Sequence, residues 1–78
     1  MSRAILQDWT DSRVPLRFDQ HREVRYQVYR ECDRHFLELR EPAGGSLIHK
    51  LELPDGMRLD RPSYEVLLRY VLLDVVAA

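Results

Sequence analysis

The last fifteen residues, Tyr64 to Ala78, constrain the fold of this chain most strongly. They contain twelve apolar residues and three charged ones, Glu65, Arg69 and Asp74. On a helix, Glu65 and Arg69 lie on one side and Asp74 lies on the opposite side, so no continuous polar stripe forms. A helix that is apolar around its circumference is normally covered on every side. Because a chain of 78 residues has little material to cover it, we expect part of this helix to contact another protein.

The residues before this run supply the signals for a helix start. They combine cap chemistry with a first-turn proline, at Asp60, Pro62 and Ser63. The β-branched residues between Tyr70 and Val76 leave a strand as an alternative, but the uninterrupted length of the run favours a helix. A bilayer-spanning helix needs about 20 apolar residues, and this run is shorter and contains Arg69 and Asp74. The run therefore predicts a core or interface helix.

Three segments show the alternation of apolar and polar residues that is typical of strands. They are Glu23 to Cys32, His35 to Arg40, and Leu47 to Leu53. Asp33 and Arg34 form a tight connection between the first two, and the loop at residues 42–46 contains a proline and paired glycines. If Glu41 lies opposite Leu47, then Leu39 lies opposite His49 and Leu37 opposite Leu51. This register places the leucines on one face.

The N-terminal quarter of the chain has a mixed pattern. Ser2 is a suitable cap for a short helix through about Asp11, because Ile5 and Trp9 are four residues apart with Leu6 on the same side. The alternation from Val14 to Phe18 then indicates a strand. Because Pro15 cannot donate a ladder hydrogen bond, this strand is expected at a sheet edge. Residues 19–21 form the turn that follows.

Together these elements predict an α+β two-layer sandwich. An antiparallel meander of three to four strands carries the long C-terminal helix on one face, with a short N-terminal helix beside it. Residues 1–78 form one domain, since no linker or composition shift divides them. A domain of this size buries only about 60% of the surface that its unfolded chain exposes. A partner interface would therefore add useful stability, and we expect self-association.

The composition limits the cellular compartment and the classes of partner that we expect for this chain. The net charge of -1 and the pI near 6.3 provide no long-range attraction to nucleic acid or to anionic lipid. Cys32 is the only cysteine, so no intramolecular disulfide can form and a reducing compartment is expected. The first residues lack the apolar segment of a signal peptide. These features predict a cytoplasmic protein without membrane contact.

The chain carries no recognisable catalytic or metal-binding motif. Cys32 and His35 have a C-x-x-H spacing, but a zinc site needs four converging ligands, and His49 is expected in mid-strand far from this hairpin tip. No serine or lysine has a predictable neighbouring base. We therefore expect no enzyme activity, no metal and no cofactor. A small enzyme assembled across a dimer cleft from His35 or His49 is the least favoured alternative.

The polar face of the predicted sheet offers a different function. It presents aromatic and cationic residues, Arg25, Tyr29, Phe36 and Arg40, in a pattern reminiscent of a nucleic-acid stacking platform. The same face carries several glutamates, so salt bridges around covered aromatic rings explain the pattern without a ligand. A nucleic-acid-binding module using this face is therefore the alternative to protein binding.

The leading hypothesis is a small non-enzymatic protein-interaction domain. It would act as an adaptor, or as an inhibitor of a larger protein assembly of the kind that bacteria and phages encode. Its partner would be a second copy, a larger protein target, or both. The residues proposed for the interface are apolar positions of the C-terminal helix, namely Leu68, Leu72, Val75 and Val76.

Overall fold

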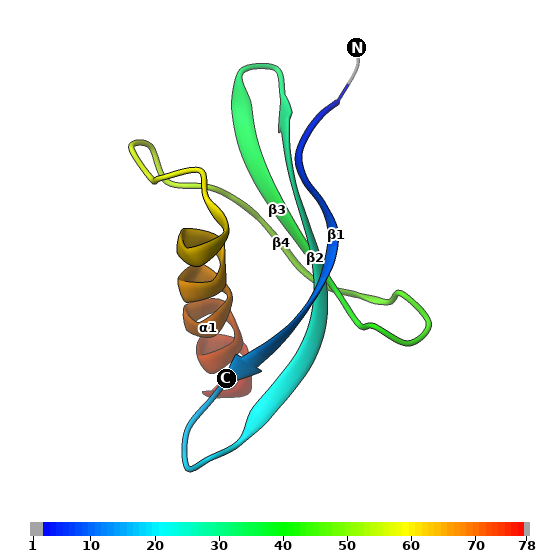
Figure 1. Ribbon diagram of the computed structural model, residues 1–78, viewed down its shortest axis with the longest axis vertical. Coiled ribbons are helices and arrows are strands. Elements are labelled where there is room, and N and C mark those ends of the chain that lie inside the picture. The colour runs from blue at the N-terminus through cyan, green and yellow to red at the C-terminus, as the bar shows by residue number, and fades with distance from the viewer. Residues whose placement is uncertain (1–2, 78) are drawn as a thin grey trace.

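A computed structural model places the chain in one four-stranded sheet and one helix (Figure 1). It describes residues 3–77, and the side chains of residues 3–74. The elements are β1 (Ala4–Pro15), β2 (His21–Glu31), β3 (Arg34–Arg40), β4 (Leu47–Glu52) and α1 (Arg61–Ala77). All neighbouring strands are antiparallel, in the order β1-β2-β3-β4. The α+β class, the meander and the C-terminal helix predicted from the sequence are therefore confirmed.

The predicted N-terminal helix is wrong, because the residues assigned to it lie in β1. This strand contains two irregularities in its pairing with β2, between Ile5 and Gln7 and between Gln7 and Thr10. Each β-bulge inserts a residue and shifts the alternation of side chains between the two faces. Because the alternation is disturbed, the apolar residues Ile5, Leu6 and Trp9 are not two apart in the sequence, and their spacing resembles that of a helix. Ser2, the proposed cap of that helix, lies outside the described residues.

The edge position predicted from Pro15 is correct. β1 is the first strand of the sheet, and Pro15 is its last residue, paired with His21. The strand does not continue to Phe18 as expected, because Phe18 and Asp19 adopt positive φ values of 56° and 60° and form the tip of the hairpin. The backbone N–H of Gln20 donates to the carbonyl of Arg17 across this turn, at 3.1 Å.

A two-residue turn joins β2 to β3. Glu31 pairs with Arg34, and the two residues between them, Cys32 and Asp33, have φ values of 54° and 62°. Two consecutive positive φ values are typical of a type I′ turn, whose twist matches that of the flanking strands. The turn therefore begins one residue earlier than the sequence pattern predicts.

The predicted register between β3 and β4 is confirmed along most of its length. Leu37 lies opposite Leu51, and Leu39 lies opposite His49. The register shifts after Leu39, so that Leu47 pairs with Arg40 instead of Glu41. This irregularity lies beside the loop at residues 42–46, which projects on the side of the sheet away from α1 (Figure 1).

Helix α1 begins at a capped N-terminus, as the sequence predicts. A carboxylate oxygen of Asp60 accepts a hydrogen bond from the backbone N–H of Ser63, at 3.0 Å. A hydrogen bond from the Ser63 side chain and this backbone bond together lower the pKa of Asp60, and the backbone bond satisfies one of the free N–H groups of the first turn. The helix runs from Arg61 to Ala77, so the alternative of a strand after Tyr70 is wrong.

The core lies between α1 and the face of the sheet that it covers. Its buried members are Val14, Val24, Tyr26, Val28, Leu37, Leu39, Leu53, Tyr64, Leu68 and Leu72. The rings of Tyr26 and Tyr64 meet edge to face, with their centroids 6.4 Å apart. Desolvation by this packing raises the pKa of both phenols. The roll angle of the helix is thus set by Tyr64, Leu68 and Leu72 facing the sheet.

Candidate functional site

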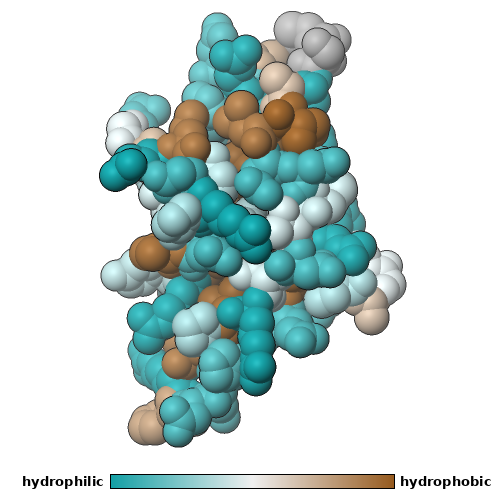
Figure 2. Space-filling view, viewed as in Figure 1, coloured by the Kyte–Doolittle hydropathy of each residue, from teal (hydrophilic) through white to brown (hydrophobic). Residues whose placement is uncertain are grey.

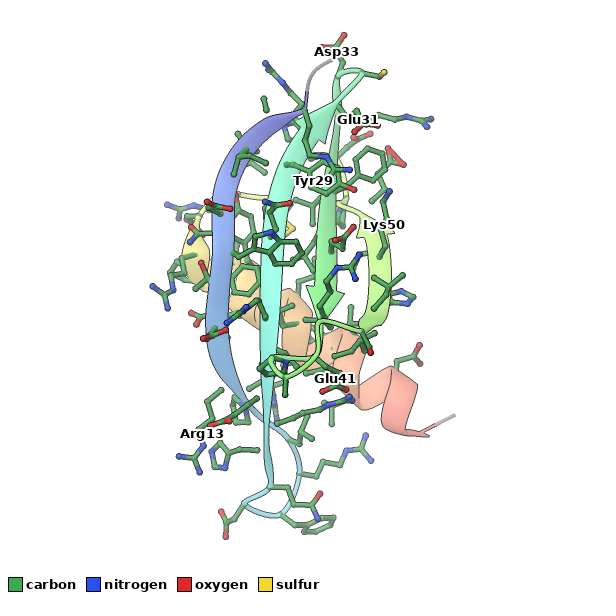
Figure 3. The ribbon with its side chains drawn as sticks, turned by 90° about the vertical axis from the view of Figure 1, so that its right-hand side faces the viewer. Arg13, Tyr29, Glu31, Asp33, Glu41 and Lys50 are labelled. Atoms are coloured by element: carbon green, nitrogen blue, oxygen red, sulfur yellow. The ribbon has the colours of Figure 1, made fainter. Side chains whose placement is uncertain are left out.

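The two surfaces singled out by the sequence lie on opposite sides of the molecule. One is the face of the sheet that α1 leaves uncovered, which Figure 3 shows with Tyr29 of β2 and Lys50 of β4 on the near side. The other is the outer face of α1, which is turned away from the sheet. Both carry large apolar side chains and arginines, so they are best distinguished by the contacts those side chains make.

Two aromatic residues of the uncovered sheet face, Tyr29 and Phe36, are covered by their neighbours. Tyr29 has an exposed fraction of 0%, and its ring stacks on that of Phe36 with centroids 5.6 Å apart. The guanidinium of Arg3 lies 3.8 Å from the centroid of Tyr29, and the ammonium of Lys50 lies 5.4 Å from that of Phe36. These cation–π contacts cover the rings. A base that stacked on Tyr29 would first have to displace Arg3.

The two arginines predicted for nucleic-acid contacts are bound to carboxylates of the same chain. Arg25 donates from Nε to Oδ1 of Asp11 at 2.8 Å, and this bond lowers the pKa of Asp11. Arg40 donates from Nε to Oε2 of Glu38 at 2.8 Å and from a terminal amino group to the carbonyl of Gly45 at 2.7 Å. A phosphate would compete with these acceptors, so the face offers little free positive charge.

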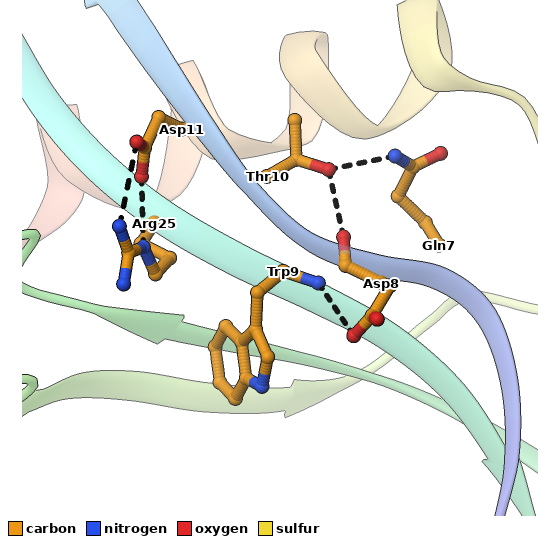
Figure 4. A network of polar contacts seen from close by, with 6 residues as sticks. All are labelled: Gln7, Asp8, Trp9, Thr10, Asp11 and Arg25. Carbon is orange, nitrogen blue, oxygen red and sulfur yellow. Dashed lines mark hydrogen bonds and ion pairs between the residues drawn. The ribbon is translucent and has the colours of Figure 1, made fainter.

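The second bulge of β1 adds a tryptophan to the uncovered sheet face. The ring of Trp9, which is 40% exposed, projects from this bulge (Figure 4). Its centroid lies 6.0 Å from the guanidinium of Arg40. The backbone N–H of Trp9 donates to Oδ1 of Asp8 at 2.8 Å, and the side chain of Gln27 donates to the same oxygen at 3.1 Å. The hydroxyl of Thr10 accepts from Gln7 and donates to the carbonyl of Asp8, both at 2.7 Å. The bulge is therefore held by its own polar groups.

The residues proposed for the partner interface do not lie together on the outer face of α1. Leu68 and Leu72 both have exposed fractions of 0% and pack in the core. Val75 and Val76 belong to α1, but their side chains lie outside the described residues. Leu68 and Leu72 must therefore be removed from the candidate interface, because contact with a partner would require them to leave the sheet.

Three other apolar residues occupy the outer face, and they are not among the interface residues predicted from the sequence. Val66 is 59% exposed and Tyr70 is 69% exposed, while Leu73 is half-buried. We call these three residues the outer stripe. On a helix the outer stripe lies between Arg69 and Asp74, within an arc of about 140°, and the core residues fill the wider arc on the opposite side. The widths of the two arcs are the sequence signal that distinguishes the exposed side from the buried one.

A shallow groove adjoins the outer stripe. It encloses about 350 Å³ and is lined by Met57, Ser63, Val66, Leu67 and Tyr70. Met57 comes from the segment that leads into the helix, so this segment and α1 together form the groove. In the view of Figure 2 the largest group of hydrophobic atoms lies near the top, above α1, and the side where α1 runs shows small, separate hydrophobic groups among hydrophilic atoms. The outer stripe and this groove form one apolar surface.

A polar pocket of about 460 Å³ lies between the β2–β3 turn and the segment that follows β4. Its lining includes Asp33, Arg34, His35 and Asp55, and the guanidinium of Arg34 lies 3.3 Å from a carboxylate oxygen of Glu52. His35 lies near the start of β3, whereas His49 of β4 pairs with Leu39 in mid-strand, so the two histidines considered for catalysis lie at different positions along neighbouring strands. Within residues 3–77, no group of three or more His, Cys, Asp or Glu residues could hold a metal ion.

No helix in the described part of the chain is long and apolar enough to cross a membrane. Comparisons with protein-family models, with curated proteins and with solved structures found no match.

Proposed function

We propose that this chain is a small non-enzymatic protein-interaction domain that binds its partner through the outer face of α1. The observation that carries the proposal is the exposure of Val66 and Tyr70, at 59% and 69%, on a helix whose opposite side is already in the core. Both side chains flank a groove that is itself mainly apolar. Exposed apolar patches of this kind are typical of protein-binding surfaces.

The energetics of burial support the same assignment. Removing apolar surface from water stabilises a contact by roughly 25 cal/mol per Å², and Tyr70 combines a large apolar ring with a hydroxyl that can stay at the wet rim. Tyrosine is enriched among the residues that dominate binding energy for this reason. The charged neighbours Arg69 and Asp74 are exposed on either side. The surface thus has an apolar centre and a charged rim, which is the usual arrangement of a protein interface.

The partner would be a second copy of the chain or a larger protein assembly, for which this domain would act as an adaptor or an inhibitor. The size of the domain and its lack of a catalytic motif favour this role over an enzyme. A reducing cytoplasm suits a chain with a single cysteine. The nucleic-acid alternative has weaker support, because Arg25 and Arg40 are engaged by Asp11 and Glu38.

The test compares affinity purification from cells with three forms of the tagged chain. The first is the natural sequence, the second carries Val66→Glu together with Tyr70→Glu, and the third carries Phe18→Glu. Phe18 is 93% exposed at the β1–β2 hairpin tip, so the third form places a glutamate at an exposed apolar position elsewhere. We expect bound protein to be lost only from the second form. Equal binding by all three forms would refute the assignment of the surface.

A further inference from the structure

We propose that the outer stripe packs against the outer stripe of a second copy, with the two α1 helices parallel and side by side about a two-fold axis. This inference rests on the proposed function and identifies the partner surface. The outer stripe and Ser63 follow one another at intervals of three, four and three residues: Ser63, Val66, Tyr70 and Leu73. This is the spacing of the a and d positions of a coiled coil, where Ser63 and Tyr70 take a, and Val66 and Leu73 take d.

The charged residues beside this seam have the arrangement that a parallel pair requires. Arg69 immediately precedes Tyr70 and occupies a g position, and Asp74 immediately follows Leu73 and occupies an e position. In a parallel coiled coil, a g residue faces the e residue five positions further along the other helix. Arg69 of each copy would therefore face Asp74 of the other, and the two-fold axis would form this ion pair twice.

Both members of this ion pair are available in the single chain. Arg69 and Asp74 are exposed. Arg69 uses its Nε to donate to the carbonyl of Pro15 at 3.1 Å, which fixes the side chain and leaves its terminal amino groups for another acceptor. Asp74 makes no ion pair with the described residues. An exposed acid and a positioned guanidinium thus stand on opposite sides of the seam.

The antiparallel arrangement is less favourable for the same charges. If the two helices ran in opposite directions with the outer stripe centred, Arg69 would meet its own counterpart, and like charges would face each other. Glu65 lies on the Arg69 side of the helix, but its carboxylate already accepts a hydrogen bond from Ser12 at 3.3 Å and lies 3.8 Å from the guanidinium of Arg61. Charge complementarity therefore selects the parallel pair.

The shape of the surface also fits a second copy of itself. A two-fold contact uses the same patch on both chains, so the patch must contain both projecting side chains and a hollow to receive them. Val66 and Tyr70 project, and the groove beside them has Met57 and Leu67 in its lining. The seam spans only part of a 17-residue helix, so the contact is small. We expect a reversible dimer with a dissociation constant in the micromolar range or above.

Sedimentation equilibrium with charge-exchange variants tests this geometry. The natural chain is compared with Arg69→Asp, with Asp74→Arg, and with the double variant that carries both changes. Each single change places like charges across the seam and should weaken dimerisation about tenfold or more, whereas the double variant restores opposite charges and should recover most of it. Circular dichroism of each variant checks that the monomer is folded. The loss of the bond to Pro15 is common to Arg69→Asp and the double variant, so it cannot produce the recovery.

Three outcomes would overturn the inference. The first is a chain that stays monomeric at millimolar concentration. The second is a dimer that none of the charge variants weakens. The third is a double variant no better than the worse single one. If the chain is monomeric, but affinity purification still loses a protein when Val66 and Tyr70 become Glu, only the second copy is excluded and the proposed function stands. If that purification shows no dependence on these residues, the proposed function fails as well.

Discussion

The uncovered face of the sheet and the outer face of α1 are built from similar residues but differ in how far the chain itself satisfies them. On the sheet, Tyr29 is covered by Phe36 and Arg3, and Arg25 and Arg40 are paired with carboxylates. On the helix, Val66 and Tyr70 are exposed beside a groove. Aromatic and cationic residues thus indicate a binding surface only where neighbouring residues leave them accessible.

The largest expected effect comes from truncating one tyrosine on each face and comparing the losses of stability. Tyr29→Ala should destabilise the fold by about 3–5 kcal/mol, the range for truncating a large buried aromatic residue. Tyr70→Ala should change stability by less than about 0.5 kcal/mol, because its side chain is mostly exposed. Urea denaturation of the monomer measures both. Similar losses for the two variants would contradict the distinction between the two faces.

A conservative change at the same site tests how the hydroxyl of Tyr29 is accommodated. This hydroxyl is buried and makes no bond of good hydrogen-bond geometry within residues 3–74, although its interaction with the Lys50 ammonium raises the pKa of Lys50. Because an unsatisfied buried hydroxyl is costly, Tyr29→Phe should leave the denaturation midpoint unchanged or raise it, by up to about 1 kcal/mol in free energy of unfolding. A clear loss of stability would show that the hydroxyl bonds to a neighbour such as Lys50 in solution.

A second comparison separates the two sides of α1. Leu72→Ala should cost about 2–5 kcal/mol, since Leu72 is fully buried against the sheet. Val66→Ala should leave the stability of the monomer within about 0.5 kcal/mol of the natural chain and weaken only association. The same denaturation experiment, repeated at several protein concentrations, distinguishes the two effects. If Leu72→Ala proved harmless, the roll angle of the helix would be wrong.

The cap of α1 gives a smaller and pH-dependent effect. Hydrogen bonds from Ser63 lower the pKa of Asp60 below its ordinary value of 3.8. The carboxylate therefore stabilises the fold fully above that value, and this contribution is lost as the pH falls through the lowered pKa. Asp60→Ala should lower the melting temperature by a few degrees at neutral pH.

Asp60→Asn is the matched control for the cap, because asparagine caps helices about as well as aspartate. It should retain most of the melting temperature at neutral pH. The difference between Asp60→Ala and the natural chain should shrink below pH 3.8. A difference that stays constant down to the acid limit would mean that the Asp60 carboxylate does not act through its charge.

The smallest expected effect concerns the uncovered sheet face. Single-stranded RNA at physiological salt should produce no measurable binding, and Arg25→Ala or Arg40→Ala should not change this result, because both guanidinium groups are already paired. Fluorescence anisotropy with a labelled oligonucleotide measures it. Salt-sensitive binding that Arg25→Ala abolishes would transfer the functional assignment from the helix to the sheet.

The sequence predicted β2, β3 and β4 well because their alternation is nearly unbroken and their turns contain suitable residues. Leu37 and Leu39 therefore lie opposite Leu51 and His49, as expected. β1 could not be predicted in this way, since the two bulges at Ile5 to Thr10 disturb the period of two. With a regular alternation of apolar and polar residues, these residues would have been predicted as a strand.

The sequence also predicted that α1 is apolar on both of its sides, but it assigned Leu68 and Leu72 to the wrong one. An apolar helix does not fix its own roll angle; the sheet does. Tyr64 meets Tyr26, and this contact turns Leu68 and Leu72 inward and leaves Val66 and Tyr70 outside. The contacts of the sheet face, such as Arg3 over Tyr29, join residues far apart in the sequence. For that reason they could not be predicted from the sequence either.

The most direct test of the central claim is a series of ¹⁵N–¹H correlation spectra of the natural chain from micromolar to millimolar concentration. If the outer face of α1 is the contact surface for a second copy, the amide signals that move with concentration will belong to residues around Val66, Tyr70 and Leu73 and to the groove at Met57. The signals of Arg25, Tyr29 and Phe36 on the sheet will stay in place. Shifts confined to the sheet face, or no shifts at any concentration, would contradict the account.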